Sequence, residues 1–209
     1  MITNEKHLLH ILGVDKGQLE YLLTHLEDYY YSFEKPKINK ITGKPKKNAD
    51  GKIATRQINS SKGKLKEVQT RLYNFMLKQV EIPQYAYGGV KGKNNVRNAR
   101  FHQGNKYIFT TDLMSFFPSI FQMFLREGCT PAVARILTKL TTRQYQVPQG
   151  IPTSTLIANL VFKPIGAEIE QLSKTHHIKF SMFVDDITLS SKSDFKDLIP
   201  EFLSILSRV

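Results

Sequence analysis

Apolar side chains recur along most of this chain at spacings of three and four residues, which are typical of amphipathic helices. The pattern that runs from Leu19 to Phe33 predicts an N-terminal helix over residues 18–33. The same spacing predicts five further helices, over residues 65–80, about 118–127, about 131–142, 152–172 and about 194–207. Pro83 ends the helix over 65–80, and Gly128 ends the helix that begins near Pro118.

Other runs are rich in β-branched and aromatic residues and predict strands. One such run, Tyr-Ile-Phe-Thr-Thr over residues 107–111, ends at Asp112. Two more, over residues 178–184 and 187–190, predict a hairpin with the adjacent acids Asp185 and Asp186 at its tip. Helices combined with an antiparallel hairpin predict an α+β fold.

The three acids at these strand ends are the candidate catalytic residues. Adjacent aspartates are common at turns, and an isolated Asp-Asp pair is a turn more often than a catalytic site. Here a tight hairpin would aim Asp185 and Asp186 at one point, and Asp112 ends a separate strand 73 residues before Asp185. Because a charge is costly inside a core, an acid at the end of a buried strand is placed for function. Three such carboxylates can hold two divalent metals.

Oxygen ligands favour hard cations, so the expected cofactor is a pair of Mg²⁺ ions, with Mn²⁺ as the alternative. Asp112 and Asp185 are the best candidates for bridging the two ions, and Asp186 assists. Zinc is disfavoured because Cys129 is the single cysteine and the six histidines show no ligand spacing.

Composition is that of an ordinary folded chain: 209 residues, of which 41% are hydrophobic and 23% charged, are enough for one sizeable core or two small lobes. No apolar run approaches membrane length, and no N-terminal signal peptide pattern is present, so no membrane partner is expected. A single cysteine excludes an intramolecular disulfide framework. We therefore expect a cytoplasmic, reducing compartment.

The net charge of +12 is concentrated in the middle of the chain, where residues 35–106 carry eighteen basic and three acidic side chains. Residues 35–64 are rich in Lys, Gly, Pro and Asn and predict an extended, hairpin-like lobe with a strand from Ile53 to Ile58. Such a basic block indicates either a solvated face or a surface that neutralises phosphates. Three interleaved aromatic residues favour nucleic acid, although they fit a core equally well: Tyr85, Tyr87 and Phe101.

In this order the segments resemble the reverse transcriptase family, and within it the bacterial retron and group II intron branch, from about residue 30 to residue 190. Asp112 followed by Phe-Phe-Pro-Ser-Ile over residues 116–120 is similar to the family's first metal-binding element. The resemblance implies that Asp112 binds metal through its side chain and Leu113 through its backbone carbonyl. It also implies that Phe117 packs against the sugar of the incoming nucleotide, which favours dNTPs and disfavours an RNA-dependent RNA polymerase.

Two more elements carry the resemblance. Residues 147–154, Val-Pro-Gln-Gly-Ile-Pro-Thr-Ser, are similar to the family's Gln-Gly-x-Pro-Thr-Ser element, which implies that Gln149 and Gly150 contact the nascent base pair and templating strand. By itself the Pro-Gln-Gly-Ile-Pro sequence is more often a loop and a helix entry. Residues 98–102, Asn-Ala-Arg-Phe-His, resemble an element of the retron branch, and we expect His102 to be a hydrogen-bonded structural histidine without a catalytic role.

Upstream, Pro45-Lys46-Lys47 and Arg56-Gln57-Ile58 resemble the fingers strands whose Lys and Arg grip the triphosphate. Arginine provides a planar clamp for phosphate and lysine a point charge, so Arg56 and Lys47 are the candidate triphosphate ligands. Lys47 also fits an ordinary surface lysine.

The resemblance implies a right-hand polymerase fold that contains a palm and fingers. The palm would be an antiparallel sheet with packed helices, and the thumb would be absent. The expected domains are an N-terminal helical segment over 1–34, basic fingers over 35–106 and a palm over 107–209. The later palm strands and the thumb would lie beyond Val209, which leaves three explanations open: a fragment, a protein completed by a further chain that supplies the thumb, or a remnant that binds nucleic acid.

The expected function is that of an RNA-directed DNA polymerase of retron type, which extends a DNA or RNA primer on an RNA template with dNTPs. A cognate structured non-coding RNA and a role in antiviral defence are implied by the family. The rival function is that of a catalytically incompetent module for nucleic-acid binding or assembly.

Overall fold

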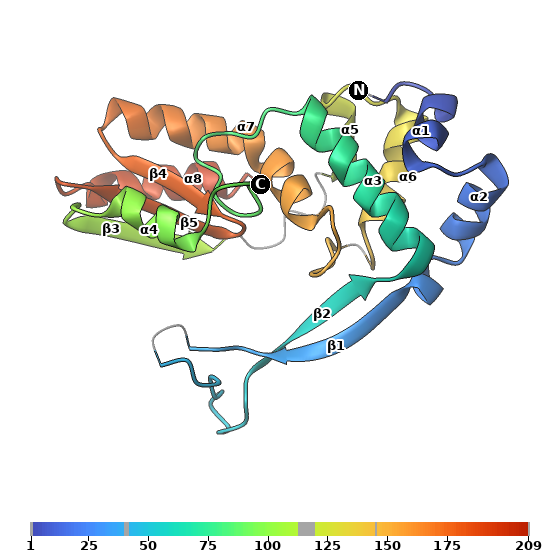
Figure 1. Cartoon of the computed structure of the whole chain (residues 1–209). Coiled ribbons are helices and arrows are strands. Elements are labelled where there is room, and N and C mark those ends of the chain that lie inside the picture. The colour runs from blue at the N-terminus through green and yellow to red at the C-terminus, as the bar shows by residue number, and fades with distance from the viewer. Residues whose placement is uncertain (1, 40–41, 113–119, 145, 209) are drawn as a thin grey trace.

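Two hydrophobic clusters organise the chain, and one helix, α7 (Ser154–Thr175), contributes to both. The computed structural model describes residues 2–39, 42–112, 120–144 and 146–208. Leu156 and Leu160, near the start of α7, pack in the first cluster with the N-terminal helices. Phe162 and Ile169, further along the same helix, pack in the second cluster with the main sheet. Figure 1 shows α7 running from one half of the molecule into the other.

The first half of the molecule is helical. Its helices gather on one side of Figure 1: α1 (Glu5–Leu12), α2 (Lys16–Thr24), α3 (Gly63–Gln79), α5 (Ile120–Arg126) and α6 (Pro131–Thr141). Side-chain caps define where α1 and α2 begin. The Asn4 side chain accepts a hydrogen bond from the His7 amide, and Asp15 and Gln18 form a reciprocal capping box. Buried side chains at helical spacing, from Leu65 to Met76, attach α3 to the core.

The second half contains a three-stranded antiparallel sheet in the order β3-β5-β4. Its strands are β3 (Tyr107–Asp112), β4 (Lys179–Phe183) and β5 (Asp186–Ser191). One sheet face, which includes Met182 and Leu189, packs with α7 and α8 (Ile199–Leu206), and a short 3-10 turn, η3 (Lys196–Leu198), precedes α8. Helix α4 (Asn95–His102) covers part of the opposite face, where His102 contacts β4 and β5.

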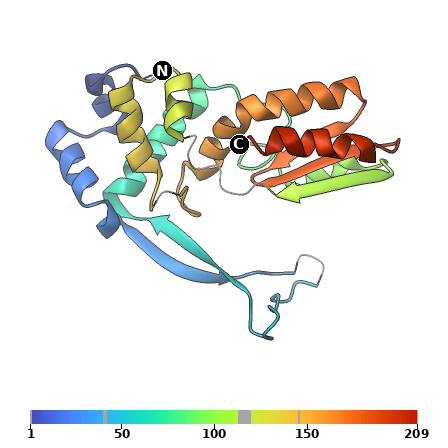
Figure 2. The same cartoon turned by 180° about the vertical axis from the view of Figure 1, so that it is seen from behind.

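A two-stranded antiparallel hairpin projects from the helical half, as both Figure 1 and Figure 2 show. It consists of β1 (Tyr30–Pro36) and β2 (Thr55–Ser61), and we call residues 30–61 the arm. Two isolated bridges, Ile38 with Pro45 and Lys47 with Ile53, continue the pairing toward its tip.

The helix predicted over residues 18–33 is wrong beyond Thr24. Residues Leu26–Tyr29 form a 3-10 turn, η1, and residues 30–36 form strand β1. The aromatic run from Tyr29 to Phe33 has high strand propensity, and pairing with β2 outweighs the helical spacing of its apolar residues. The strand predicted from Ile53 to Ile58 is correct in kind, but it lies at residues 55–61.

The other main elements are confirmed: the helices over 65–80, 131–142 and 152–172, the strand that ends at Asp112, and the acidic hairpin. The α+β prediction is confirmed, because helices and two small antiparallel sheets make up the described chain. Tyr85 lies in the second core cluster, so it belongs to the core and not to a nucleic-acid surface. Over the described ranges, no helix combines the length and apolar character needed to cross a bilayer.

Candidate active site

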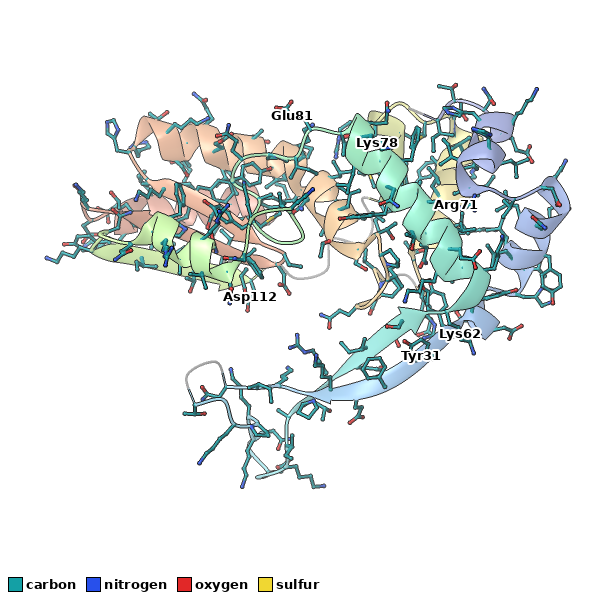
Figure 3. The ribbon with its side chains drawn as sticks, in the orientation of Figure 1. Tyr31, Lys62, Arg71, Lys78, Glu81 and Asp112 are labelled. Atoms are coloured by element: carbon teal, nitrogen blue, oxygen red, sulfur yellow. The ribbon has the colours of Figure 1, made fainter. Side chains whose placement is uncertain are left out.

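The three-stranded sheet places two of the three candidate carboxylates in direct cross-strand register. Phe183 pairs with Asp186, so Val184 and Asp185 form a two-residue turn between β4 and β5. In the neighbouring ladder Asp112 pairs with Asp186. Directly opposite residues of an antiparallel pair point to the same sheet face, with Cβ atoms about 4.5–5.5 Å apart. Asp112 and Asp186 therefore share one face at the end of the sheet, and Asp185 lies in the adjoining turn; Figure 3 labels Asp112 at this end.

All three aspartates are exposed, and their donors are carboxylate oxygens, which suit hard divalent cations of the Mg²⁺ or Mn²⁺ type. Within the described ranges, however, no three His, Cys, Asp or Glu side chains are arranged closely enough to hold a metal ion. The fold thus brings Asp112 and Asp186 together without completing a three-carboxylate site. Leu113 and Phe117, the other residues predicted here, lie outside the described residues.

The acidic turn is braced from outside the sheet. Val184 adopts a φ of +64° at the first turn position, a conformation that glycine usually provides. Gly88 packs directly against it: a Cβ on Gly88 would lie 2.4 Å from the Val184 nitrogen. The Asn159 side chain of α7 donates to the Gly88 carbonyl (3.1 Å), and Met182 exchanges backbone hydrogen bonds with Tyr85 and Tyr87. These contacts fix the turn that carries Asp185 relative to α7.

The Gln149–Gly150 loop docks on the edge of β2. The Asn59 amide donates to the Gln149 carbonyl (2.9 Å), and the Ser60 hydroxyl donates to the Gly150 carbonyl (3.2 Å). Gly150 has a φ of +109°, and a Cβ on it would lie 2.6 Å from Ser60 Oγ and 2.9 Å from Ile58 Cγ2. Gly150 therefore allows the arm to approach the loop closely, while the predicted contact of Gln149 and Gly150 with the nascent base pair stays a prediction. Both loop residues remain exposed.

The arm carries a pair of cations that face each other across the strands. Lys35 and Arg56 are register partners, both are exposed, and neither forms an ion pair with an acid in the described part of the chain. Like charges at directly opposite positions destabilise a strand pair, so this arrangement suits an anionic ligand. Lys47, the other predicted triphosphate ligand, forms an isolated bridge with Ile53 nearer the tip of the arm.

Sequence reasoning missed Lys35 because it assigned Tyr31 and Phe33 to a helix. Strand periodicity places Tyr31, Phe33 and Lys35 on one face of β1, which is the signal that would have identified it.

His102 has the structural role expected for it. Its Nδ1 lies 2.6 Å from Ser190 Oγ and its Nε2 lies 2.7 Å from Ser181 Oγ, and the Asn105 amide also donates to Ser190 Oγ (2.7 Å). Burial, assisted by the nearby Lys179 charge, lowers the pKa of His102 to about 4. The neutral imidazole thus ties α4 to β4 and β5.

Comparison with known proteins gives consistent matches. The family model described as "Reverse transcriptase (RNA-dependent DNA polymerase)" matches residues 44–208. The Retron Se72 reverse transcriptase of Salmonella heidelberg is 29% identical over 192 residues, which is 88% of this chain and 47% of that protein. The Retron Ec86 reverse transcriptase of Escherichia coli is 28% identical over 134 residues, which is 62% of this chain and 42% of that protein.

The Retron Mx162 reverse transcriptase of Myxococcus xanthus is 26% identical over 216 residues, which is 90% of this chain and 42% of that protein. The chain spans about half the length of the curated relatives it matches.

Proposed function

The chain belongs to the reverse transcriptase family, and from this premise we propose that it is an RNA-directed DNA polymerase of retron type. It would extend a DNA or RNA primer on an RNA template by adding deoxynucleotides. Retron relatives that match up to 90% of the chain support the retron assignment and a cognate structured RNA as partner. We assign the arm and the basic segment over 35–106 to the fingers and residues 107–209 to the palm.

One observation carries the catalytic part of this proposal: the register that sets Asp112 opposite Asp186, beside the turn that holds Asp185. Asp112, Asp185 and Asp186, with the Leu113 carbonyl, would hold two Mg²⁺ ions, or Mn²⁺ in their place. Such ions, when bound, activate the primer hydroxyl and neutralise charge on the phosphates during in-line displacement. The acids themselves need only be exposed and close together, because the nucleotide and primer complete the site.

On the substrate side, Arg56 would hold the triphosphate by a planar, charge-assisted clamp. Lys35, its register partner, is better placed than Lys47 to add the second positive charge. Phe117 would pack against the deoxyribose, and Gln149 and Gly150 would lie beside the nascent base pair.

Primer extension tests the proposal. The purified chain is given an RNA template, a labelled primer, dNTPs and Mg²⁺, and is compared with Asp112→Asn, Asp185→Asn and the matched control Asp197→Asn, an exposed acid on η3. We expect incorporation by the wild type and the control, and a loss of at least a hundredfold in the first two variants, with RNA binding retained in all four proteins. Incorporation that survives in both active-site variants would contradict the assignment of these acids.

A second candidate function is a non-catalytic module for nucleic-acid binding or assembly. It is favoured by the exposed cationic arm, on which Lys35 and Arg56 face each other without forming an ion pair to an acid in the described residues. In the same experiment, RNA binding by the wild type without any incorporation would favour this module, or a requirement for a further chain that supplies a thumb.

A further inference from the structure

Besides the buried Ser61–Gln69 hydrogen bond (2.6 Å) at its base, the arm is attached to the segment that joins α6 to α7, and Arg143 is the centre of that second attachment. The Arg143 guanidinium contacts three places at once. Its Nε and Nη2 lie 2.9 and 2.8 Å from Glu27 Oε2, and its Nη1 donates to Ser32 Oγ (3.1 Å) and Asn59 Oδ1 (3.2 Å). It also lies over the Tyr30 ring, 4.8 Å from the centroid. Only 17% of the Arg143 side chain is exposed, so the guanidinium is largely shielded, although its partners Glu27 and Ser32 are exposed to solvent.

The two strand residues that Arg143 binds belong to opposite strands of the arm. Ser32 on β1 is the register partner of Asn59 on β2, and the Ser32 hydroxyl also donates to Asn59 Oδ1 (2.6 Å). A single guanidinium therefore joins both strands at the same level of the ladder. Arginine can do so because its donors project in a fixed planar fork, whereas a lysine ammonium is a point charge.

The same segment also binds the backbone of Asn59. Arg143 and Gln146 exchange two backbone hydrogen bonds of 2.9 Å, which turns the chain so that Gln149 can accept from the Asn59 amide. Asn59 is thus fixed by its side chain to Arg143 and by its backbone to Gln149. The connection between α6 and α7 therefore contacts the arm twice, through the Arg143 side chain and through the Gln149 backbone.

We infer that Arg143 is a positioning residue for the nucleotide site and sets the angle of the arm, an inference that rests on the proposed function. Lys35 and Arg56 lie three residues beyond Ser32 and Asn59, which is about 10 Å along the strands. A tilt of about 10° at the attachment would move them by about 2 Å, which is enough to break a charge-assisted hydrogen bond of about 2.8 Å to a phosphate and so to weaken dNTP binding. Loss of Arg143 thus misplaces the triphosphate ligands without altering any of them.

The test compares Arg143→Ala and Arg143→Lys with Arg135→Ala, an exposed arginine on α6, and with Ser32→Ala/Asn59→Ala, which removes only the strand partners. Amide hydrogen exchange over residues 30–61 reports the attachment independently of activity. The KM for dNTP and kcat report positioning. We expect Arg143→Ala to speed exchange in the arm at least tenfold and to raise the KM for dNTP at least tenfold, with a smaller change in kcat.

Arg143→Lys should recover part of both effects, the Ser32/Asn59 variant should reproduce them partly, and Arg135→Ala should change neither. Unchanged arm exchange in Arg143→Ala overturns the inference whatever the activity. Faster exchange with an unchanged KM overturns the positioning role. Absence of incorporation by the wild type overturns the proposed function, while the exchange data still decide whether Arg143 holds the arm.

Discussion

Individual residues in this protein are paired in a way that local stability alone would not favour. Asp112 faces Asp186 in the sheet, and Lys35 faces Arg56 in the arm, although like charges at opposite positions cost free energy. The two pairs have opposite sign. A nucleotide triphosphate with its divalent ions has cations that would relieve the first pair and an anion that would relieve the second. Under the proposed function, one ligand would therefore supply opposite charge to both pairs.

A residue-scale prediction concerns His102 and pH. Its pKa of about 4 in the folded protein lies below the ordinary 6.5, so the unfolded chain binds the proton more readily. The contribution of neutral His102 to stability is therefore complete above pH 6.5 and is lost as the pH falls toward 4. Between pH 7 and pH 4 the free energy of unfolding of the wild type should fall by roughly 3 kcal/mol more than that of His102→Gln.

Urea unfolding at pH 7, 5.5 and 4 measures this difference. The glutamine amide of the variant can still form hydrogen bonds with Ser181 and Ser190, but it does not titrate. Because the carboxylates titrate equally in both proteins, their contribution to the pH dependence of stability cancels in the comparison. Parallel pH profiles for the two proteins would show that His102 does not titrate as inferred.

At the scale of elements, sequence was sufficient for most helices and strands in which one apolar face decides the structure, although α1, which buries Leu8 and Leu12, was not predicted. Helix α7 and the acidic hairpin were predicted because their burial patterns are continuous and local. Helix α4 was missed because it buries only His102 and shows no apolar stripe, so the sheet beneath it decides its position. The hairpin-like form of residues 35–64 was predicted, but the start of β1 was assigned to a helix because its strand pairing joins residues about twenty-five positions apart, which no local pattern contains. For the same reason the contact of Arg143 with the arm could not be recognised, because its partners Asn59 and Ser32 lie 84 and 111 positions away in the sequence.

An element-scale prediction follows from the exposed aromatic face of β1. Tyr31 and Phe33 are 47% and 44% exposed, their rings stack with centroids 5.9 Å apart, and Lys35 shares their face. Aromatic faces beside cations bind unpaired bases by stacking, at about 1–3 kcal/mol per base. Tyr31→Ala and Phe33→Ala should each weaken binding of single-stranded RNA about tenfold or more, with little change in melting temperature.

Fluorescence anisotropy with a labelled RNA oligonucleotide measures the affinity. The matched control is Tyr21→Ala, an aromatic on α2 that is 59% exposed and stacks on His25. An equal loss of affinity in the control, or none in the arm variants, would exclude stacking on this face.

For the whole molecule, charge and shape act together. Residues 1–34 carry two basic and six acidic side chains and residues 107–209 carry ten and nine, so the excess of positive charge lies in residues 35–106. Sequence predicted this excess, but only the fold shows that much of it is on an arm that projects from the helical half (Figure 2). A projecting cationic arm can follow a nucleic-acid backbone without moving the two cores.

The salt dependence of RNA binding tests this distribution. Each phosphate neutralised on a single strand contributes about 0.7 to the slope of log affinity against log salt concentration. Replacing Lys44, Lys46 and Lys52 by glutamine removes three exposed charges from the arm and should reduce the magnitude of the slope by about 2. The control replaces Lys174, Lys192 and Lys196, three exposed lysines of the sheet half, and should leave the slope unchanged. Because both triple variants lower the net charge equally, a slope that falls equally in both would mean that RNA responds to overall charge and not to the arm.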